Sequence, residues 1–380
     1  MSTNTGTALH VDVLVVGAGA AGASTAMLLA RRGARAMVVD RSAYGSDTLS
    51  SHALMRGAVE RLHRWQLLDR LWDAGTPVIR RAVFGYGTDE VAFDVSATEG
   101  VPGLAAPRRT VLDPILVDAA ADAGADVRHG TALVRVIRDA SGRVCGARLR
   151  DGAGTFTVSC DLLVGADGLH SGVARQVGAP VTRSGAHASA YVLRYLRDLD
   201  EPGDEYQWRY GVRTGAGVVP TNDGTWCVFA AMPPDRFAAG RADLGRLMDT
   251  VLGEVDGDLA RRVEGSAPAG PLRSWPGTVG RFRRAHGPGW ALVGDAGYFK
   301  DPFAAHGISD ALRDAELLAD AVTAGDLAAY EARRDALSAP LFDALERVAS
   351  YEWELGDLPD LHVAMARAMR DEELAFAGAR

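Results

Sequence analysis

Three glycines and one aspartate in the first forty residues have the spacing of a nucleotide-binding site. Gly17, Gly19 and Gly22 lie in the run GAGAAG, and Asp40 follows 23 residues after the first of them. The first glycine permits a tight turn, the second lets a pyrophosphate approach the backbone, and the third lets a helix pack closely on a strand. The acid would bind ribose hydroxyls. These residues predict a site for the ADP half of a dinucleotide.

The elements around the glycines are those that such a site requires. Residues 11–16 read VDVLVV, a β-branched run typical of a buried parallel strand. Residues 23–32 favour a helix, and residues 36–39 favour a second strand that ends at Asp40. The N-terminus of that helix would face the phosphate charge with free N–H groups.

The remainder of the chain alternates between helical and strand patterns. Helices are predicted over 54–71, 109–123, 308–324 and the stretch after 326, and a further buried strand over 290–294. Residues 181–275 are short β-branched and aromatic runs broken by Gly, Asn and Pro, which is typical of an antiparallel sheet, and 82–95 resembles them.

Composition narrows the class of protein. A chain of 380 residues is longer than one hydrophobic core usually organises, so we expect two domains or one large α/β domain with insertions. Its 47% hydrophobic and 24% charged residues are typical of a globular protein. A net charge of −8 argues against a nucleic-acid partner. Cys145, Cys160 and Cys227 form no CxxC pair, so we expect neither a zinc site nor disulfides, and we expect a cytoplasmic location. No signal peptide is expected at residues 1–10, and residues 11–30 fit a strand, turn and helix better than a transmembrane helix.

Two later segments identify the cofactor. Residues 165–175 read GADGLHSGVAR, and residues 291–318 read ALVGDAGYFKDPFAAHGISDALRDAELL. With GAGAAG and the spacing Arg109-x-x-Leu112-x-x-x-Leu116, these segments resemble the motifs of the FAD-dependent aromatic hydroxylases, the class A flavoprotein monooxygenases, in the same order. The resemblance also extends to the geranylgeranyl reductases and flavin halogenases.

The resemblance implies an α/β fold in which a Rossmann-like FAD-binding domain carries an inserted β-sheet domain for the substrate, followed by C-terminal helices. The FAD-binding domain would comprise 1–80, 100–180 and 276–325, the substrate domain 81–99 and 181–275, and the helical segment 326–380. Asp295 would bind the ribityl and pyrophosphate end of the flavin. The helix after Gly307 would point its positive end at the flavin ring and stabilise the anionic reduced form. The cofactor-binding residues implied are Gly17, Gly19, Gly22, Asp40, Arg41, Arg109, Asp167, Gly168, Arg175, Gly294, Asp295, Gly307 and Ile308.

Candidates for catalysis and substrate binding follow from position. His52 lies in an SSH turn, and Pro302 and His306 lie in the loop that would pass the flavin. Tyr206, Trp208 and Tyr210 alternate on one predicted strand and therefore share a face. The expected catalytic residues are His52, Pro302 and His306. The expected substrate-binding residues are Tyr206, Trp208, Tyr210, Pro220 and Phe229. The alternative role of each aromatic residue is packing in the core. The alternative role of His306 is to shape the loop in which it lies.

The chain also departs from the hydroxylase pattern. After Pro302 the hydroxylases show Gly-x-Gly-x-Asn, whereas this chain has Ala305, Gly307 and Ser309. The insertion FKDP is similar to that of the flavin halogenases. However, WxWxIP is missing, and Lys300, the single lysine, is in the wrong part of the chain for the lysine of that family.

The implied activity is a monooxygenase that uses NAD(P)H and O2 to hydroxylate or epoxidise an aromatic or polyketide-like substrate through a C4a-hydroperoxyflavin. Only one GxGxxG occurs, so NAD(P)H would bind transiently, or a separate flavin reductase would supply electrons. The alternative is an FAD-dependent reductase or dehydrogenase of C–C double bonds, resembling the geranylgeranyl reductases. A halogenase and a non-enzymatic escort protein are weaker alternatives.

Overall fold

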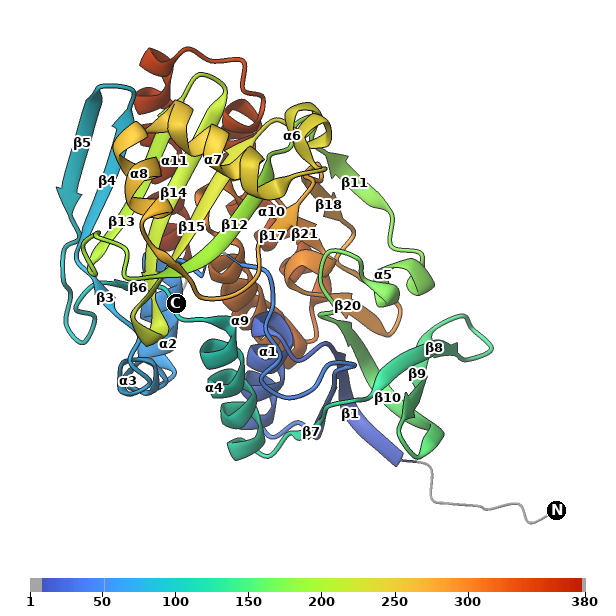
Figure 1. The fold of residues 1–380 in the computed structure, drawn as a ribbon. Coiled ribbons are helices and arrows are strands. Elements are labelled where there is room, and N and C mark those ends of the chain that lie inside the picture. Colours follow the sequence, from blue (N-terminus) through green and yellow to red (C-terminus); the bar gives the residue numbers. More distant parts are fainter. Residues whose placement is uncertain (1–8, 51, 378–380) are drawn as a thin grey trace.

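The computed structural model describes residues 9–50 and 52–377, and two large sheets organise them (Figure 1). The N-terminal stretch 1–8, in which no signal peptide was expected, lies outside the described residues. In the first sheet, β1 (Leu9–Val16) pairs in parallel with β10 (Gly154–Gly165) and with β2 (Ala36–Val39). β20 (Trp290–Leu292) and β7 (Asp126–Arg128) extend this parallel set at its edges.

The turn after β1 depends on two glycines. Gly17 has a φ of +106°, and a Cβ there would lie 2.3 Å from the carbonyl oxygen of Ala166. A Cβ on Gly22 would lie 1.8 Å from the carbonyl oxygen of Gly17. Only glycine accommodates this backbone conformation and this contact, so helix α1 (Ala20–Arg31) can begin directly above the end of the strand.

Helices cover one face of the first sheet. α1 lies between α4 (Arg109–Asp122) and α9 (Gly307–Ala324), and Val13 and Val15 of β1 point into this layer. The opposite face, on which Leu14 of β1 is buried, is covered by a meander and a short helix. These elements are β8 (Ala132–Arg138), β9 (Val144–Asp151) and α5 (Gly172–Val177).

The second large sheet has the strand order β16-β12-β15-β14-β13-β4-β5, with β17 also paired to β12. Its pairs are antiparallel except β13 with β4, which are parallel. Its strands are β4 (Arg81–Tyr86), β5 (Asp89–Asp94), β12 (Ala190–Arg197), β13 (Glu205–Gly211), β14 (Thr214–Thr221), β15 (Thr225–Met232), β16 (Ala267–Pro268) and β17 (Arg273–Trp275).

The two faces of the second sheet are covered by different helices (Figure 1). The outer face packs on α6 (Pro234–Gly240), α7 (Leu244–Val255) and α8 (Gly257–Glu264). The inner face carries most of the aromatic side chains and packs on α10 (Leu327–Ala349) and α11 (Leu358–Ala377).

The remaining elements are a third, small sheet and several short segments. A three-stranded sheet joins β11 (Val181–Ser184), β18 (Arg281–Arg283) and β21 (Tyr298–Phe299). The other short elements are α2 (Arg56–Arg64), α3 (Leu68–Asp73), β3 (Val78–Ile79), β6 (Leu104–Ala105), β19 (His286–Gly287) and the 3-10 turns η1 (Asn222–Gly224), η2 (Gly294–Ala296), η3 (Pro302–Ala304) and η4 (Leu355–Asp357).

The structure corrects the sequence-based expectations in four places. The helix predicted over 54–71 is two helices, because Gln66 turns with a φ of +62° between α2 and α3. The sheet region 181–275 contains the helices α6 to α8, and its first strand, β11, pairs with β18 instead of the large sheet. The second sheet is not wholly antiparallel.

Within 9–50 and 52–377, no helix combines the length and apolarity that crossing a membrane would require.

Candidate functional site

A cavity of about 960 Å³ lies between the two large sheets. Its walls come from the loops that follow β1, β2, β10 and β20, from the start of α4, and from the inner face of the second sheet. The carboxyl ends of parallel strands are where open α/β sheets bind their ligands. The volume is at the upper end of the ~300–1,000 Å³ found for small-molecule and cofactor sites.

Asp40 lines the end of the cavity next to the glycine turn. Its Oδ2 accepts a hydrogen bond of 2.7 Å from the backbone N–H of Ala18, and its Oδ1 accepts one of 2.7 Å from that of Ser42. Gly19 and the exposed Arg41 line the same region. Gly22 does not line the cavity, because it is the packing contact between α1 and the glycine turn.

Arg109 lies beside the glycine turn. Its guanidinium forms two hydrogen bonds of 2.7 Å with the carboxylate of Asp113, one turn along α4. A Cβ on Gly19 would be 3.2 Å from its Nη2. The guanidinium therefore lies directly against the approach to the backbone that a pyrophosphate would use.

The loop after β10 places Asp167, Gly168 and Arg175 in the cavity wall. Asp167 accepts hydrogen bonds from the backbone N–H groups of Gly172 at 2.6 Å and Val173 at 3.1 Å. Its carboxylate is thus engaged at the start of α5. Arg175 donates to the carbonyl oxygen of His170 at 2.7 Å and is largely exposed.

The loop after β20 brings Asp295, Pro302, Gly307 and Ile308 to the opposite wall. Gly294 is behind that wall, where a Cβ would lie 2.9 Å from the Cβ of Ala21. Helix α9 begins here without a side-chain cap, so the N–H groups of its first turn are open to a ligand. Burial raises the pKa of Asp295 to about 6, although the nearby cations Lys300 and Arg109 lower it.

The two predicted catalytic histidines do not line the cavity. His52 is fully buried, and its Nε2 contacts the hydroxyl of Tyr195. The Nδ1 of His306 is 3.1 Å from Oδ1 of Asp310. Burial lowers the pKa of both histidines well below the ordinary value, so both are neutral at pH 7. Pro302 is the one predicted catalytic residue in the wall.

Of the predicted substrate-binding residues, some line the cavity and others are buried away from it. Trp208 and Phe229 line the cavity. Tyr206 does not, because its hydroxyl is bound to the carbonyl oxygen of Ala105, and Tyr210 is stacked on Phe303 and Tyr86 in the core.

Pro220 also lies outside the lining. It follows Val219, which packs in the inner core, and alternation along β14 therefore points Pro220 to the other face.

Sequence reasoning missed several residues of the wall. Tyr191 and Leu193, which alternate on β12, line it together with Trp275 and Phe299. Strand periodicity in residues 190–197 was the available signal, but nothing in the sequence said which face is covered. The wall also includes charged or titratable groups that were not assigned to it, namely Asp47, Asp113, His129, Arg150, His170, Lys300, Asp301 and Asp310.

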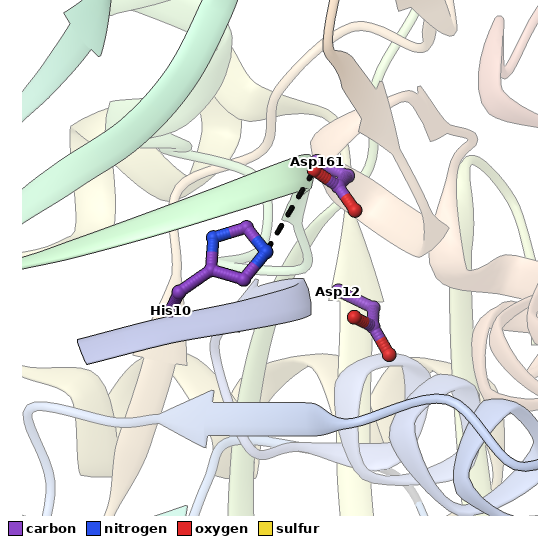
Figure 2. A group of neighbouring side chains, drawn as sticks. All are labelled: His10, Asp12 and Asp161. Atoms are coloured by element: carbon purple, nitrogen blue, oxygen red, sulfur yellow. Dashed lines mark ion pairs between the residues drawn. The ribbon is translucent and has the colours of Figure 1, made fainter.

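Two groups of possible metal ligands occur in the described part of the chain, and both are already paired with cations. Figure 2 shows the exposed group, in which His10 Nε2 is 3.9 Å from Asp161 and Asp12 lies beside them. Arg35 donates to Asp12 through Nε at 3.0 Å. The buried group is His306, Asp310 and Glu372, against which Lys300 and Arg313 are placed.

The glycine turn under a helix, the acid at the end of the second strand and the uncapped helix across the cavity together fit a dinucleotide cofactor. The chain belongs to the FAD binding domain family, whose sequence profile matches residues 10–339. A menaquinone reductase from Mycolicibacterium smegmatis is 29% identical over 84% of this chain and 78% of its own length. Aklavinone 12-hydroxylase DnrF from Streptomyces peucetius is 33% identical over 50% of this chain and 42% of its own.

The same architecture occurs in the flavin-dependent brominase Bmp2, with a TM-score of 0.80 and 19% identity over 94% of this chain and 93% of that one. This likeness concerns the fold. The protein is therefore an FAD-dependent oxidoreductase with relatives among monooxygenases and reductases.

We expect Asp295→Ala to weaken FAD binding by roughly 1–3 kcal/mol, the cost of leaving buried polar groups without a partner. Asp295 lines the cavity, and its backbone does not depend on its side chain, so the fold should persist. Titration of the apoprotein with FAD, followed by flavin fluorescence, measures the change. Asp343→Ala, at an exposed carboxylate paired with Arg183, is the control. An FAD affinity unchanged by Asp295→Ala would show that this carboxylate does not contact the cofactor.

Proposed function

We propose that this protein is an FAD-dependent monooxygenase that takes electrons from NAD(P)H and hydroxylates or epoxidises an aromatic or polyketide-like small molecule. The observation that carries the proposal is one continuous cavity. It runs from the glycine turn and Asp40, past Asp295 and the start of α9, to an aromatic wall on the second sheet. Bound FAD would supply the activation of O2.

The residues present fit FAD. Gly19 leaves open a space that a side chain would fill, and the N–H groups at the start of α1 would bind the pyrophosphate. Asp40 would hold the adenosine ribose, and Asp295 the ribityl hydroxyls. The uncapped N-terminus of α9 would stabilise negative charge on the reduced ring. Asp167, Gly168 and Arg175 would serve the pyrophosphate and the transient NAD(P)H.

The chain's contribution beyond binding is to orient the substrate and exclude water. The wall opposite α9 is apolar and aromatic. A dry, closed pocket protects reactive oxygen species from wasteful loss as peroxide. The residues that would face the substrate are Tyr191, Leu193, Trp208, Phe229, Trp275 and Phe299. The cytoplasm, which contains NAD(P)H, suits a chain with three free thiols.

A second candidate function is the reduction of a C–C double bond or a quinone. The menaquinone reductase aligns with 84% of this chain, whereas the aklavinone hydroxylase aligns with 50%. The reductase alignment therefore extends over more of this chain than the hydroxylase alignment does.

Oxygen uptake separates the two candidates. The yellow holoprotein should be mixed with NADPH or NADH and a panel of phenols, polyketide quinones, indoles and prenylated quinones, with and without an added flavin reductase. A monooxygenase consumes one O2 for each NAD(P)H when its substrate is present. NAD(P)H oxidation that continues unchanged without oxygen while an alkene or quinone is reduced would select the reductase.

We expect Trp208→Leu to raise the KM of the substrate about tenfold, which is ~1.4 kcal/mol of lost contact, without changing FAD affinity. Trp208 lines the cavity and stacks on Phe84 at 5.4 Å. Trp226→Leu is a matched control, because Trp226 packs on the outer face of the same sheet. Steady-state kinetics with a substrate identified in the oxygen-uptake screen measures the KM of each variant. Equal KM values for the two variants would show that Trp208 does not contact the substrate.

A further inference from the structure

Lys300 is the single lysine of the chain, since 40 of its 41 basic Lys and Arg residues are arginine. It lies between β21 and η3, lines the cavity and is 5% exposed. Arginine keeps its charge in proteins, whereas a buried lysine can lose its proton. Lys300 therefore gives the buried part of the cavity wall a basic group whose charge can change.

The immediate surroundings of Lys300 contain one carboxylate in contact and two nearby. Its ammonium forms an ion pair with Asp310 in the first turn of α9, and it lies 5.0 Å from the ring centre of Tyr298. The carboxylate of Asp295, in η2, is close enough to raise the pKa of Lys300 through its negative charge. Asp301 is engaged elsewhere, because its oxygens accept from the backbone N–H groups of Ser189 at 2.6 Å and Phe303 at 3.0 Å.

Further charged groups surround Asp310. Arg313 Nη1 is 3.1 Å from Asp310 and 2.9 Å from Glu372, which belongs to α11. Asp314 pairs with Arg313 at 2.7 Å. His306 contacts Asp310 and is neutral, since burial lowers its pKa. Asp310 is therefore shared between Lys300 and a guanidinium that is already balanced by two other carboxylates.

Two opposing effects act on the Lys300 ammonium. Burial, together with the nearby guanidinium of Arg313, lowers its pKa to about 7. The carboxylates of Glu372, Asp314 and Asp295, and the contact with Asp310, favour the charged form. A group held in this balance responds to any further charge that enters the cavity, because an added negative charge favours the ammonium.

We propose that Lys300 binds a proton when the flavin in this cavity is reduced, so that its ammonium balances the negative charge that reduction adds. The proposal rests on the use of FAD proposed above. Lys300 Nζ takes up to one proton from solvent, according to pH, for each two electrons and one proton that pass from NAD(P)H to the cofactor. On reoxidation the same proton is released from Nζ. Lys300 thus acts on the cofactor electrostatically from the cavity wall and takes no part in the bond-forming steps.

The single lysine makes the first test direct. Protein labelled with [13C]lysine, without a lysine-containing tag, gives one lysine spin system, and the Cε shift reports protonation. We expect its titration midpoint to be near pH 7 in the oxidised holoprotein and at least one pH unit higher in the anaerobically reduced holoprotein. Equal midpoints in the two redox states would overturn the proposal.

The second test uses thermodynamic linkage, because a proton bound on reduction makes reduction pH-dependent. Between the two midpoints, the equilibrium constant for two-electron reduction should fall with rising pH by an additional factor of up to ten per pH unit, about 30 mV, the full value being reached when the midpoints are well separated. Lys300→Met and Lys300→Arg should both lose this additional dependence. Only Lys300→Met should also show weaker reduction at pH 7, since arginine keeps the charge.

The outcomes separate this proposal from the proposed function. A protein that binds no FAD would refute the function. A holoprotein that oxygenates its substrate while wild type and both variants share one pH dependence of the potential would refute only the role of Lys300. If Lys300→Met does not fold, the labelled wild-type protein alone decides.

Discussion

Gly19→Val should abolish FAD binding, with a loss of affinity of at least about a thousandfold, or ~4 kcal/mol. Gly19 is the N-cap of α1 with φ −74° and ψ −172°, an extended conformation that valine can adopt. The only atom that a Cβ would meet is Nη2 of Arg109 at 3.2 Å, the movable end of a side chain. The valine methyl groups would occupy the approach that the pyrophosphate uses. The folded chain therefore tolerates the substitution, and the cofactor does not.

Absorbance of the purified variant and its titration with FAD measure this loss, and circular dichroism confirms the fold. Gly203→Val is the matched control, because Gly203 is exposed and a Cβ there meets nothing within 4 Å. A yellow Gly19→Val protein with unchanged flavin content would contradict the assignment of the glycine turn. Gly17→Val is not a suitable test, since its Cβ would clash with the Ala166 carbonyl and unfold the turn.

The second large effect concerns stability. We expect Arg313→Met to lower the free energy of unfolding by about 3–5 kcal/mol, the range for removing one partner from a buried ion pair. Arg313 is fully buried and pairs with Asp310, Asp314 and Glu372, which join α9 to α11. Methionine replaces the volume but leaves three carboxylates without their shared counter-charge.

Urea denaturation of the apoprotein measures this change. Arg261→Met is the control, because the Arg261 side chain is 75% exposed and its pair with Asp258 is a surface pair worth little. A loss below about 1 kcal/mol in Arg313→Met would show that the buried network does not hold the C-terminal helix.

The sequence predicted the strands and helices around the glycine turn well because their signals are local. The glycine turn, its flanking strand and helix, and the start of α9 are each contained in one short segment, and each lies where the pattern indicated. Tyr206, Trp208 and Tyr210 also share the predicted face of β13. Which of the three reaches the cavity depends on what covers the sheet. The carbonyl of Ala105 binds Tyr206, and His362 of α11 stacks near Tyr210 at 4.8 Å.

Contacts between distant segments were beyond the sequence patterns. β4 pairs with β13 across 124 residues of chain, and β11 pairs with β18 across about a hundred. Periodicity carries no information about such partners. The two histidines lie outside the cavity lining for the same reason. His52 is buried by Tyr195 from the second sheet, and His306 by a network that includes Glu372 near the end of the chain.

The measurement that tests the central claim most directly is the fate of oxygen. The holoprotein, supplied with NAD(P)H and a substrate that accelerates NAD(P)H oxidation, is incubated under 18O2, and the product is weighed by mass spectrometry. A monooxygenase places one labelled oxygen atom in each product molecule, and the same incubation in 18O-labelled water under ordinary O2 places none. A product that gains two hydrogens and no label would contradict the account and assign the cavity to a reductase.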